Sequence, residues 1–325
     1  MAKILVTYSA DEPQRRTILN VLDRCSNVVF LSDLHGSDRA REIGAAEVII
    51  SWNPTLELHS SEFSMLSHLR LLQLLSAGAD HVQFTQIPPA VTIAGNAGAY
   101  AEQMAEHVLA MTLAVFKNLL DRHNKLADGT FDQKNENRLL RGATCAVLGF
   151  GGIGKATARL MRCFGVRIFA INTSGKTNEG VEFIGTLDNL EHVLRIADIV
   201  VISLPLTNAT RGLIGSRELG WMKDDATIIN VARGDIIDEG ALFKKLKEHP
   251  TFNAAIDAWW TEPLRAGKFE TTYPFLNLPN VLASPHNSGL VPGSFVIASR
   301  YAAENVRRFL DQEPILGVVK RDDYM

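Results

Sequence analysis

The feature that most constrains the fold is an alternation of short apolar runs with amphipathic stretches. In the first half of the chain, apolar runs at 3–8, 28–31, 47–51 and 71–75 alternate with helical patterns at 11–24 and near Ser37. Parallel strands joined by helical crossovers produce this order, because a parallel pair needs a long connection between its strands. The pattern therefore predicts a small doubly wound α/β sheet.

A second and longer series begins at residue 143. Its apolar runs lie at 145–150, 166–172, 198–205, 226–232, 252–258 and 280–285, and a helical pattern starts at Ile153. This is the length of a whole dinucleotide-binding domain. A last helical stretch, from about 294 to 310, follows the completed series, so we expect it to cross back and cover the first domain.

The two series are joined by a segment without a strand pattern. The pattern stops around 92–100, and residues 101–120 repeat apolar side chains at helical spacing with few charges. Such a helix needs burial on most of its circumference, which suits a domain boundary or a subunit interface. The polar stretch 121–138 predicts a surface connection. A chain of 325 residues favours two domains over a one-domain barrel.

Composition excludes several classes of protein. With 46% apolar residues, 21% charged residues and a net charge of −3, the chain is neither disordered nor polybasic, so we expect small-molecule partners and no nucleic acid. Cys25, Cys145 and Cys163 are odd in number and lack CxxC spacing, which predicts buried thiols with no disulfide and no metal site. The apolar runs are too short for a signal peptide or a membrane span, so we expect a soluble cytoplasmic protein.

A glycine-rich turn stands between the first strand and helix of the second series. In "VLGFGGIGKATARLM", Gly149, Gly151 and Gly154 have GxGxxG spacing. The first glycine permits a tight turn, the second lets the backbone approach a pyrophosphate, and the third allows close packing of helix on strand. The position of this motif, after an apolar strand and before a helix, predicts a dinucleotide site.

The residue that would meet the adenosine ribose is Asn172 rather than an acid. A neutral side chain does not repel a 2′-phosphate, and Thr173, Ser174 and Lys176 offer hydrogen bonds or charge to one. These residues favour NADP(H). NAD stays open, because no arginine is present to form a bidentate clamp and Asn172 could bind an NAD ribose.

Seven motifs occur in one order: "LLQLLSAGADHV", "GNAGAYAEQMAEHVLA", "VLGFGGIGKATARLM", "ISLPLT", "IINVARGDIIDEGAL", "AIDAWWTEP" and "SPHNSG". Together they resemble the D-isomer-specific 2-hydroxyacid dehydrogenase family over nearly the full chain. The resemblance implies a Rossmann nucleotide-binding domain at 97–288, inserted into a flavodoxin-like substrate domain formed by 1–96 and 289–325. It also implies a deep cleft, a homodimer formed through the nucleotide domains, and hydride transfer between NAD(P)(H) and a small 2-oxo or D-2-hydroxy acid.

Three residues follow apolar strands of the second series and form the expected catalytic set. Glu262 and His286 follow consecutive runs, so two parallel strands would bring them to one edge of the sheet, where ligands of α/β sheets bind. A carboxylate beside an imidazole favours its protonated form, which suits His286 as general acid and base. By resemblance, Arg233 holds the substrate carboxylate through its planar fork.

The resemblance assigns further residues. Backbone amides of the turn at Ser76, Ala77 and Gly78 would take the substrate carboxylate, Asp257 would contact the nicotinamide carboxamide, and Pro205 would pack near the adenosine. The expected cofactor set comprises Gly149, Gly151, Gly152, Ile153, Gly154, Asn172, Thr173, Ser174, Lys176, Leu204, Pro205, Val231, Ala232 and Asp257.

Some alternatives stay open. A nucleotide-responsive corepressor of the same architecture would keep these motifs, and an adenosylhomocysteine hydrolase type would need a larger substrate domain. His107 lies inside an apolar helix and is interpreted as a packed, hydrogen-bonded residue. Trp259 and Trp260 would pack in the core or shape the cleft, and Trp52 would touch the substrate side chain or cap the first sheet.

Overall fold

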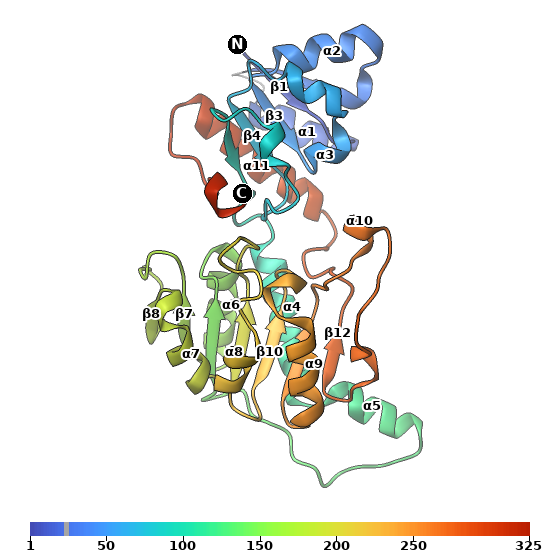
Figure 1. Cartoon of the computed structure of the whole chain (residues 1–325), viewed down its shortest axis with the longest axis vertical. Helices are drawn as coiled ribbons and strands as arrows, with labels where there is room; N and C mark the ends of the chain where they lie inside the picture. Colours follow the sequence, from blue (N-terminus) through green and yellow to red (C-terminus); the bar gives the residue numbers. More distant parts are fainter. Residues whose placement is uncertain (23–25) are drawn as a thin grey trace. The chain divides into compact units, whose positions relative to one another are not determined.

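The computed structural model describes residues 1–22 and 26–325, which form two compact units (Figure 1). Unit 1 comprises residues 1–100 and 291–325, and unit 2 comprises residues 101–290. The boundaries expected from the sequence, after residues 96 and 288, lie four and two residues before the observed ones. Each unit has its own sheet and its own cores.

Unit 1 is built on a five-stranded parallel sheet of order β2-β1-β3-β4-β5. The strands are β1 (Ala2–Val6), β2 (Ser26–Phe30), β3 (Val48–Ser51), β4 (Leu71–Leu74) and β5 (Thr92–Ala94). All residues of β3 and β4 are buried, because helices cover both faces of the sheet. The order is flavodoxin-like, as predicted. The strand pattern was expected to stop around residues 92–100, and the strand β5 at the start of this stretch was not predicted, because its three residues are too few to show a period.

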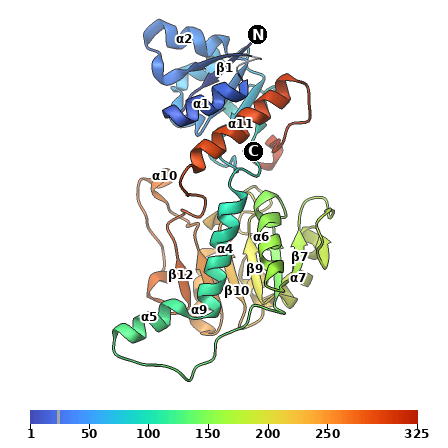
Figure 2. The same cartoon turned by 180° about the vertical axis from the view of Figure 1, so that it is seen from behind.

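Helices cover both faces of this sheet. α1 (Glu12–Leu22) and α11 (Ser294–Leu310) pack side by side on one face (Figure 2). The opposite face carries α2 (Gly36–Ala45), the short α3 (Pro54–Glu57) and the 3-10 turn at Ser60–Met65. The last helix does return to unit 1: Ala298 and Ala302 are fully buried, and the Tyr8 hydroxyl lies 2.9 Å from Ser299 Oγ.

Unit 2 is built on a seven-stranded parallel sheet of order β12-β11-β10-β9-β6-β7-β8. The strands are β6 (Thr144–Leu148), β7 (Arg167–Ile171), β8 (Phe183–Gly185), β9 (Ile199–Ile202), β10 (Thr227–Asn230), β11 (Asn253–Ile256) and β12 (Val281–Ala283). The chain order reverses between β6 and β9, which is the Rossmann arrangement. The predicted fold class, two doubly wound parallel sheets, is therefore confirmed. The sequence did not reveal the short edge strand β8.

Two apolar cores lie on the two faces of this sheet. α4 (Ala101–Phe116) and α6 (Gly152–Cys163) cover one face, and α7 (Leu190–Ile196), α8 (Ser216–Trp221) and α9 (Glu239–Glu248) cover the other (Figures 1 and 2). In α4, Val108 and Phe116 are buried against the core that contains Met161 of α6. The short α10 (Pro263–Ala266) follows Glu262, and Pro263 at its first turn suits a helix start.

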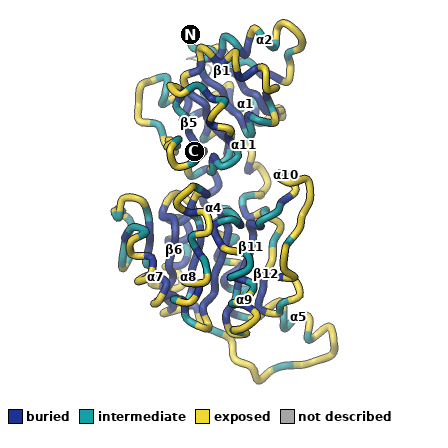
Figure 3. Tube along the Cα trace, viewed as in Figure 1, coloured by how far each residue is buried: buried dark blue, intermediate teal, exposed yellow. Residues whose placement is uncertain are grey.

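The connection after α4 is not wholly irregular. Within the stretch expected as a surface connection, α5 (Leu119–Ala127) forms, and none of its residues is buried. Figure 3 shows this helix and the segment after it as largely exposed. Large apolar side chains are open to solvent here: Leu119, Leu120, Leu126, Phe131 and Leu139 are 50–74% exposed. The segment is on the surface, as expected, but it presents apolar side chains that a polar connection would lack.

The cysteine prediction holds only in part. Cys145 is buried in β6, where burial raises the pKa of its thiol to about 12. Cys163 is exposed, which contradicts the expected buried thiol, because it lies on the outer side of the last turn of α6. Cys25 lies outside the described residues. None of the helices described is both long and apolar enough to cross a membrane.

Candidate active site

The glycine-rich turn connects β6 to α6 at the carboxyl edge of the unit 2 sheet. Gly149 has a φ of +99°, and a Cβ there would lie 2.6 Å from the Leu204 nitrogen. A Cβ on Gly154 would lie 2.2 Å from Gly149 O, whereas one on Gly151 would meet nothing within 4 Å. The first and third glycines are therefore required by backbone packing, and Gly151 leaves open space.

The start of α6 fits an anion. Gly151 is the N-cap, and no side chain of the described residues makes a cap hydrogen bond there. The N–H groups of the first turn, which contains Gly152 and Ile153, thus point from a helix N-terminus toward the space beside Gly151. This is the arrangement that holds a dinucleotide pyrophosphate, so the residues present fit the expected cofactor.

The loop after β7 is held by Asn172. The Asn172 Oδ1 accepts the backbone N–H of Ser174 at 3.1 Å and of Gly175 at 2.7 Å, and its Nδ2 donates to Lys176 O at 2.9 Å. The amide side chain therefore builds the turn, while Thr173, Ser174 and Lys176 are exposed on it. The sequence prediction of Asn172 as a direct ribose ligand took no account of this use of its side chain.

The remaining expected cofactor residues lie at the same edge. Leu204 and Pro205 follow β9, next to the glycine turn, where Ser203 Oγ donates to Gly149 O at 2.7 Å. The Pro205 carbonyl accepts the Thr210 hydroxyl at 2.6 Å. Val231 and Ala232 are buried just after β10. Their contacts with a nucleotide remain predictions.

Glu262 and His286 meet beyond the ends of two adjacent strands. β11 and β12 pair in parallel, and the chain continues from them to Glu262 and His286. His286 Nδ1 lies 2.8 Å from both carboxylate oxygens of Glu262. The structure thus brings together the acid and the histidine that the sequence placed at one edge.

The surroundings keep Glu262 ionised. Burial of this side chain raises the pKa of its carboxyl, but the hydrogen bond and charge of His286 oppose burial, with help from the Trp259 N–H and the charge of Arg233. The net effect holds the pKa of Glu262 below its usual range. The backbone N–H of Trp259 donates to Glu262 Oε1 at 2.7 Å. Glu262 is therefore a carboxylate partner for the histidine.

Arg233 follows β10, the neighbour of β11 in the sheet. Its side chain is half-buried, and its Nη1 donates to Ala232 O at 2.7 Å. The next residue is Gly234, whose Cβ would lie 2.3 Å from the Trp259 carbonyl carbon. The missing side chain lets the Arg233 turn approach the backbone that precedes Glu262. Three consecutive strand ends, those of β10, β11 and β12, thus carry the three expected catalytic residues.

Asp257 holds the loop that carries His286. It is fully buried, and its Oδ1 accepts the Ser284 hydroxyl at 2.6 Å and the Asn287 N–H at 3.1 Å, while its Oδ2 accepts the Ser288 N–H at 3.2 Å. These contacts use both carboxylate oxygens within the protein. The contact with a nicotinamide carboxamide stays a prediction. His107 Nε2 lies 3.1 Å from Ser284 Oγ, which agrees with the packed, hydrogen-bonded residue expected there.

The expected substrate-binding turn belongs to unit 1. Ser76, Ala77 and Gly78 follow β4, Ala77 is exposed, and Ser76 Oγ donates to Gly78 O at 2.8 Å. A Cβ on Gly95 would lie 2.5 Å from Ala77 O, so a glycine from the end of β5 supports the turn from beneath. The turn is compact and its tip is open to solvent.

The tryptophans are placed as follows. Trp52 packs edge-on against Phe295 in unit 1, with ring centroids 5.4 Å apart, and its backbone N–H donates to Glu57 Oε1 at 3.0 Å. Trp259 is buried and Trp260 is half-buried. Trp260 stacks on Phe275 with centroids 5.2 Å apart. The interpretation of Trp259 and Trp260 as residues that pack in the core therefore fits the structure.

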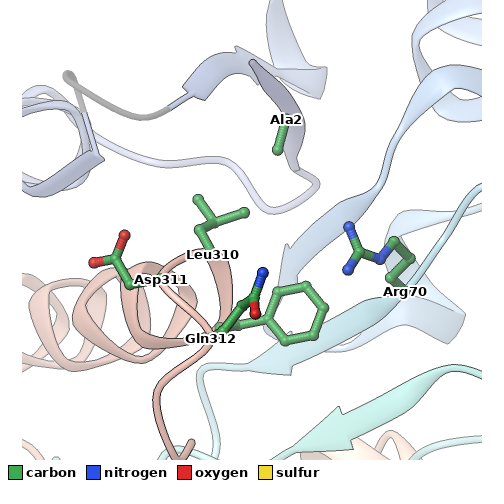
Figure 4. Close-up of a pocket in the computed structure, with 6 residues that line it drawn as sticks. Ala2, Arg70, Leu310, Asp311 and Gln312 are labelled. Atoms are coloured by element: carbon green, nitrogen blue, oxygen red, sulfur yellow. The ribbon is translucent and has the colours of Figure 1, made fainter.

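A separate pocket lies at the amino edge of the unit 1 sheet, opposite the carboxyl edge that carries the turn at Ser76. It has a volume of about 330 Å³ and is lined by Ala2, Arg70, Phe309, Leu310, Asp311 and Gln312 (Figure 4). Arg70 precedes β4 and Ala2 begins β1, so this is the amino edge of the strands. Ligands of open α/β sheets bind at the carboxyl edge, and this pocket has no part in the candidate site.

Sequence reasoning missed two residues that support the candidate site. Ser284 and Trp259 both lie within three residues of Glu262 or His286, inside the motifs already singled out. A hydroxyl and an indole so close to strand ends were a signal that polar partners were needed. The bonds of Ser284 with the Trp259 indole and with Asp257 could not be read from the sequence, because each joins the chain after β11 to the chain after β12.

Comparisons with known proteins identify the family of the chain. The model of the D-isomer specific 2-hydroxyacid dehydrogenase NAD binding domain matches residues 109–288. The chain is 30% identical to glyoxylate reductase of Aeropyrum pernix, an alignment that covers 87% of this chain and 85% of that protein.

Two other relatives extend over most of the chain. D-3-phosphoglycerate dehydrogenase of Methanocaldococcus jannaschii is 28% identical over 98% of this chain, which spans only 59% of that protein. A solved structure of a glycerate dehydrogenase related protein from Thermoplasma acidophilum is 32% identical, with a TM-score of 0.65 and coverage of 94% of this chain and 99% of that one. The chain belongs to the D-isomer specific 2-hydroxyacid dehydrogenase family.

Proposed function

We propose that the protein interconverts a small 2-oxo acid and the corresponding D-2-hydroxy acid with NAD(P)(H), and that Arg233, Glu262 and His286 carry the reaction. The observation that supports this most directly is the contact of His286 Nδ1 with Glu262, at 2.8 Å, beside the strand end that carries Arg233. The relatives named as glyoxylate reductase and as D-3-phosphoglycerate dehydrogenase support the class of substrate.

His286 moves the proton. Because Glu262 holds Nδ1, the proton exchanged with the substrate oxygen resides on Nε2. In the reductive direction His286 donates it to the carbonyl oxygen, and in the oxidative direction it takes it from the hydroxyl. Glu262 stays ionised throughout and fixes the tautomer and the ring orientation.

Arg233 binds the substrate carboxylate and polarises the adjacent carbonyl. A planar guanidinium matches two carboxylate oxygens and stabilises charge that develops on the neighbouring oxygen. The amides of Ala77 and Gly78 are proposed as further donors to the carboxylate, since the turn that carries them is exposed at the carboxyl edge of β4.

Gly151 and the N-terminus of α6 would hold the pyrophosphate of the dinucleotide. When bound, its nicotinamide supplies or accepts the hydride at C2 of the substrate. The exposed Lys176 and the hydroxyls of Thr173 and Ser174 suit a 2′-phosphate, which supports NADP(H) over NAD(H). Asn172 contributes indirectly, because it shapes the turn that presents them.

We also propose a cytoplasmic homodimer without a nucleic-acid partner. The exposed apolar side chains of α5 and of the segment after it support self-association, because large apolar side chains that face water cost free energy until a partner covers them. Sedimentation at two protein concentrations would test it. A monomer at micromolar concentration would contradict the homodimer and leave the proposed chemistry intact.

The sequence places one constraint on the charge of the substrate side chain. Residues 51–57, from the end of β3 through α3, contain no lysine or arginine, which speaks against a phosphorylated substrate held from this segment. Glyoxylate, hydroxypyruvate and bulkier unphosphorylated 2-oxo acids are therefore the proposed candidates.

The test is a panel of 2-oxo acids with NADPH and with NADH, followed at the absorbance of the reduced cofactor. Oxidation of either cofactor by a 2-oxo acid is expected, and His286→Ala should remove most turnover, a loss of about 10²–10⁴-fold, while cofactor binding persists. No turnover with any acid, together with tight nucleotide binding, would instead indicate a nucleotide-responsive binding protein. Normal turnover in His286→Ala would refute the role of the histidine.

A further inference from the structure

Trp259 links the two members of the acid and histidine pair. Its backbone N–H donates to Glu262 Oε1 at 2.7 Å, and its indole Nε1–H donates to Ser284 O at 2.8 Å. Ser284 stands two residues before His286 on the loop that follows β12. Trp259 is only 6% exposed, so its indole N–H needs a protein partner, and the partner it has is the backbone of the histidine loop.

The histidine loop requires such support. His286 has a φ of +51°, in the left-handed region that a residue with a Cβ rarely adopts, at a cost of about 1–3 kcal/mol. Asp257 holds the loop through Ser284, Asn287 and Ser288. Asp257 accepts the Ser284 hydroxyl and Ile256 O accepts the Ser284 N–H, and Trp259 adds a hydrogen bond to the Ser284 carbonyl. The conformation of His286 is therefore fixed by two residues of the chain that continues from β11.

Trp259 is itself held in place. Its ring makes edge contacts with Phe269, at a centroid distance of 5.3 Å, and with Phe275, at 6.5 Å. Its backbone carbonyl lies against Gly234, where a Cβ would come within 2.5 Å of the oxygen. A ring packed on its sides and a backbone pressed against the next turn leave the two donor groups little freedom to move.

We infer that Trp259 is a positioning residue, which sets the distance and orientation between Glu262 and the left-handed loop of His286 without touching the substrate. This inference rests on the proposed function, in which His286 transfers the proton. The lowered pKa of Glu262 agrees with it, because burial, the largest influence, is outweighed by hydrogen bonds and charges that include the Trp259 N–H. A shift of the imidazole by about 1 Å is enough to reduce a rate by about 10²-fold.

The neighbouring residue offers a matched control. Trp260 also donates its indole N–H to a backbone carbonyl, that of Ile237, at 2.7 Å, and it also packs on Phe275. Neither its indole nor its amide contacts Glu262 or the histidine loop in the hydrogen bonds described. Trp259→Phe and Trp260→Phe thus remove the same type of hydrogen bond, one beside the pair and one away from it.

The experiment compares both variants with the wild type in the reduction of the best 2-oxo acid. In Trp259→Phe, we expect kcat to fall about tenfold with the KM for the cofactor within about twofold, since the loss concerns geometry and not nucleotide binding. The pH at which kcat/KM falls to half should also move lower, because a loosened carboxylate favours the neutral imidazole. In Trp260→Phe, kcat and the pH profile should stay close to the wild type.

Equal losses in the two variants, or an unchanged kcat and pH profile in Trp259→Phe, would overturn the inference. If Trp259→Phe does not fold, benzothienylalanine at position 259 keeps the shape of the indole and removes only its N–H, and the same predictions apply to it. If the wild type reduces no 2-oxo acid, the proposed function is wrong. If the wild type is active and Trp259→Phe has the same kcat and pH profile, only the positioning role of Trp259 is wrong.

Discussion

His286 Nδ1 lies 2.8 Å from each carboxylate oxygen of Glu262. The nitrogen faces the middle of the carboxylate, so both oxygens share one ring N–H. The two residues come from the ends of adjacent parallel strands, 24 positions apart in the chain. This contact fixes the orientation of the imidazole ring and leaves Nε2 as its reacting nitrogen. It also keeps an ionised acid in a largely buried position, which is tolerated only because the acid has a partner.

The free energy of unfolding at acidic pH should depend on Glu262. The pKa of this carboxyl in the folded protein lies below its ordinary value of 4.5, so the unfolded chain binds the proton first as the pH falls. The stabilising contribution is therefore complete above pH 4.5 and is lost as the pH falls through the lowered value of the folded state. Glu262→Gln should be less stable than the wild type by about 1.5–3 kcal/mol at neutral pH.

This difference should shrink as the pH falls below 4.5 and through the lowered pKa of Glu262 in the folded state, because the wild type then also loses the ionised group. Urea unfolding of both proteins at a series of pH values measures it. A constant difference at every pH would show that the loss comes from packing and not from the charge of Glu262.

Substitutions at Gly151 and Gly154 should have different effects, one on nucleotide binding and the other on stability. A methyl group at Gly151 meets no protein atom within 4 Å, so Gly151→Ala should keep the melting temperature and weaken binding of NADPH or NADH by tenfold or more, about 1.4 kcal/mol. At Gly154 the methyl group would lie 2.2 Å from Gly149 O, and Gly154→Ala should destabilise unit 2 by about 1–3 kcal/mol. Calorimetry of melting and of nucleotide binding checks both; tight binding in Gly151→Ala would contradict the proposed pyrophosphate position.

Gly234 should be needed for the Arg233 turn. A methyl group at this position would lie 2.3 Å from the Trp259 carbonyl carbon, and backbone atoms cannot move aside without displacing Glu262. Gly234→Ala should cost about 1–3 kcal/mol in thermal stability and raise the KM for the 2-oxo acid. Gly220→Ala is a suitable control, since a Cβ there meets nothing within 4 Å. Wild-type stability and KM in Gly234→Ala would show that the turn can relax.

Asn172 offers a test of the choice of cofactor. Asn172→Asp keeps the oxygen that accepts the Ser174 and Gly175 N–H groups but loses the donor to Lys176 O, so the turn should keep two of its three hydrogen bonds from this side chain, while the new charge repels a 2′-phosphate. We expect the KM for NADPH to rise about tenfold, equivalent to about 1.4 kcal/mol, and the KM for NADH to change little. Lys176→Met should also raise the KM for NADPH, in this case by removing a positive charge and not by adding a negative one. Equal effects on both cofactors would mean that the turn itself had been disrupted.

Much of the fold was accessible from the sequence. The long apolar runs that became β6, β9 and β10, and the glycine spacing between β6 and α6, reflect local requirements: burial on both faces of a sheet and a turn that excludes Cβ atoms. The edge strand β8 and the terminal strand β5 were missed because three residues carry no measurable period. The helix α5 was missed because the segment lacks a buried face.

The sequence by itself determined which strand ends carry an acid, a histidine and an arginine, because residue type and position after an apolar run are local properties. Tertiary structure alone decided how these residues are held: the indole N–H of Trp259 on Ser284, the carboxylate of Asp257 on the loop after β12, and the left-handed backbone of His286. Both hydrogen bonds join the chain after β11 to the chain after β12. Their partners are chosen by strand order and register, which depend on the packing of the whole unit and not on any neighbouring residue in the chain.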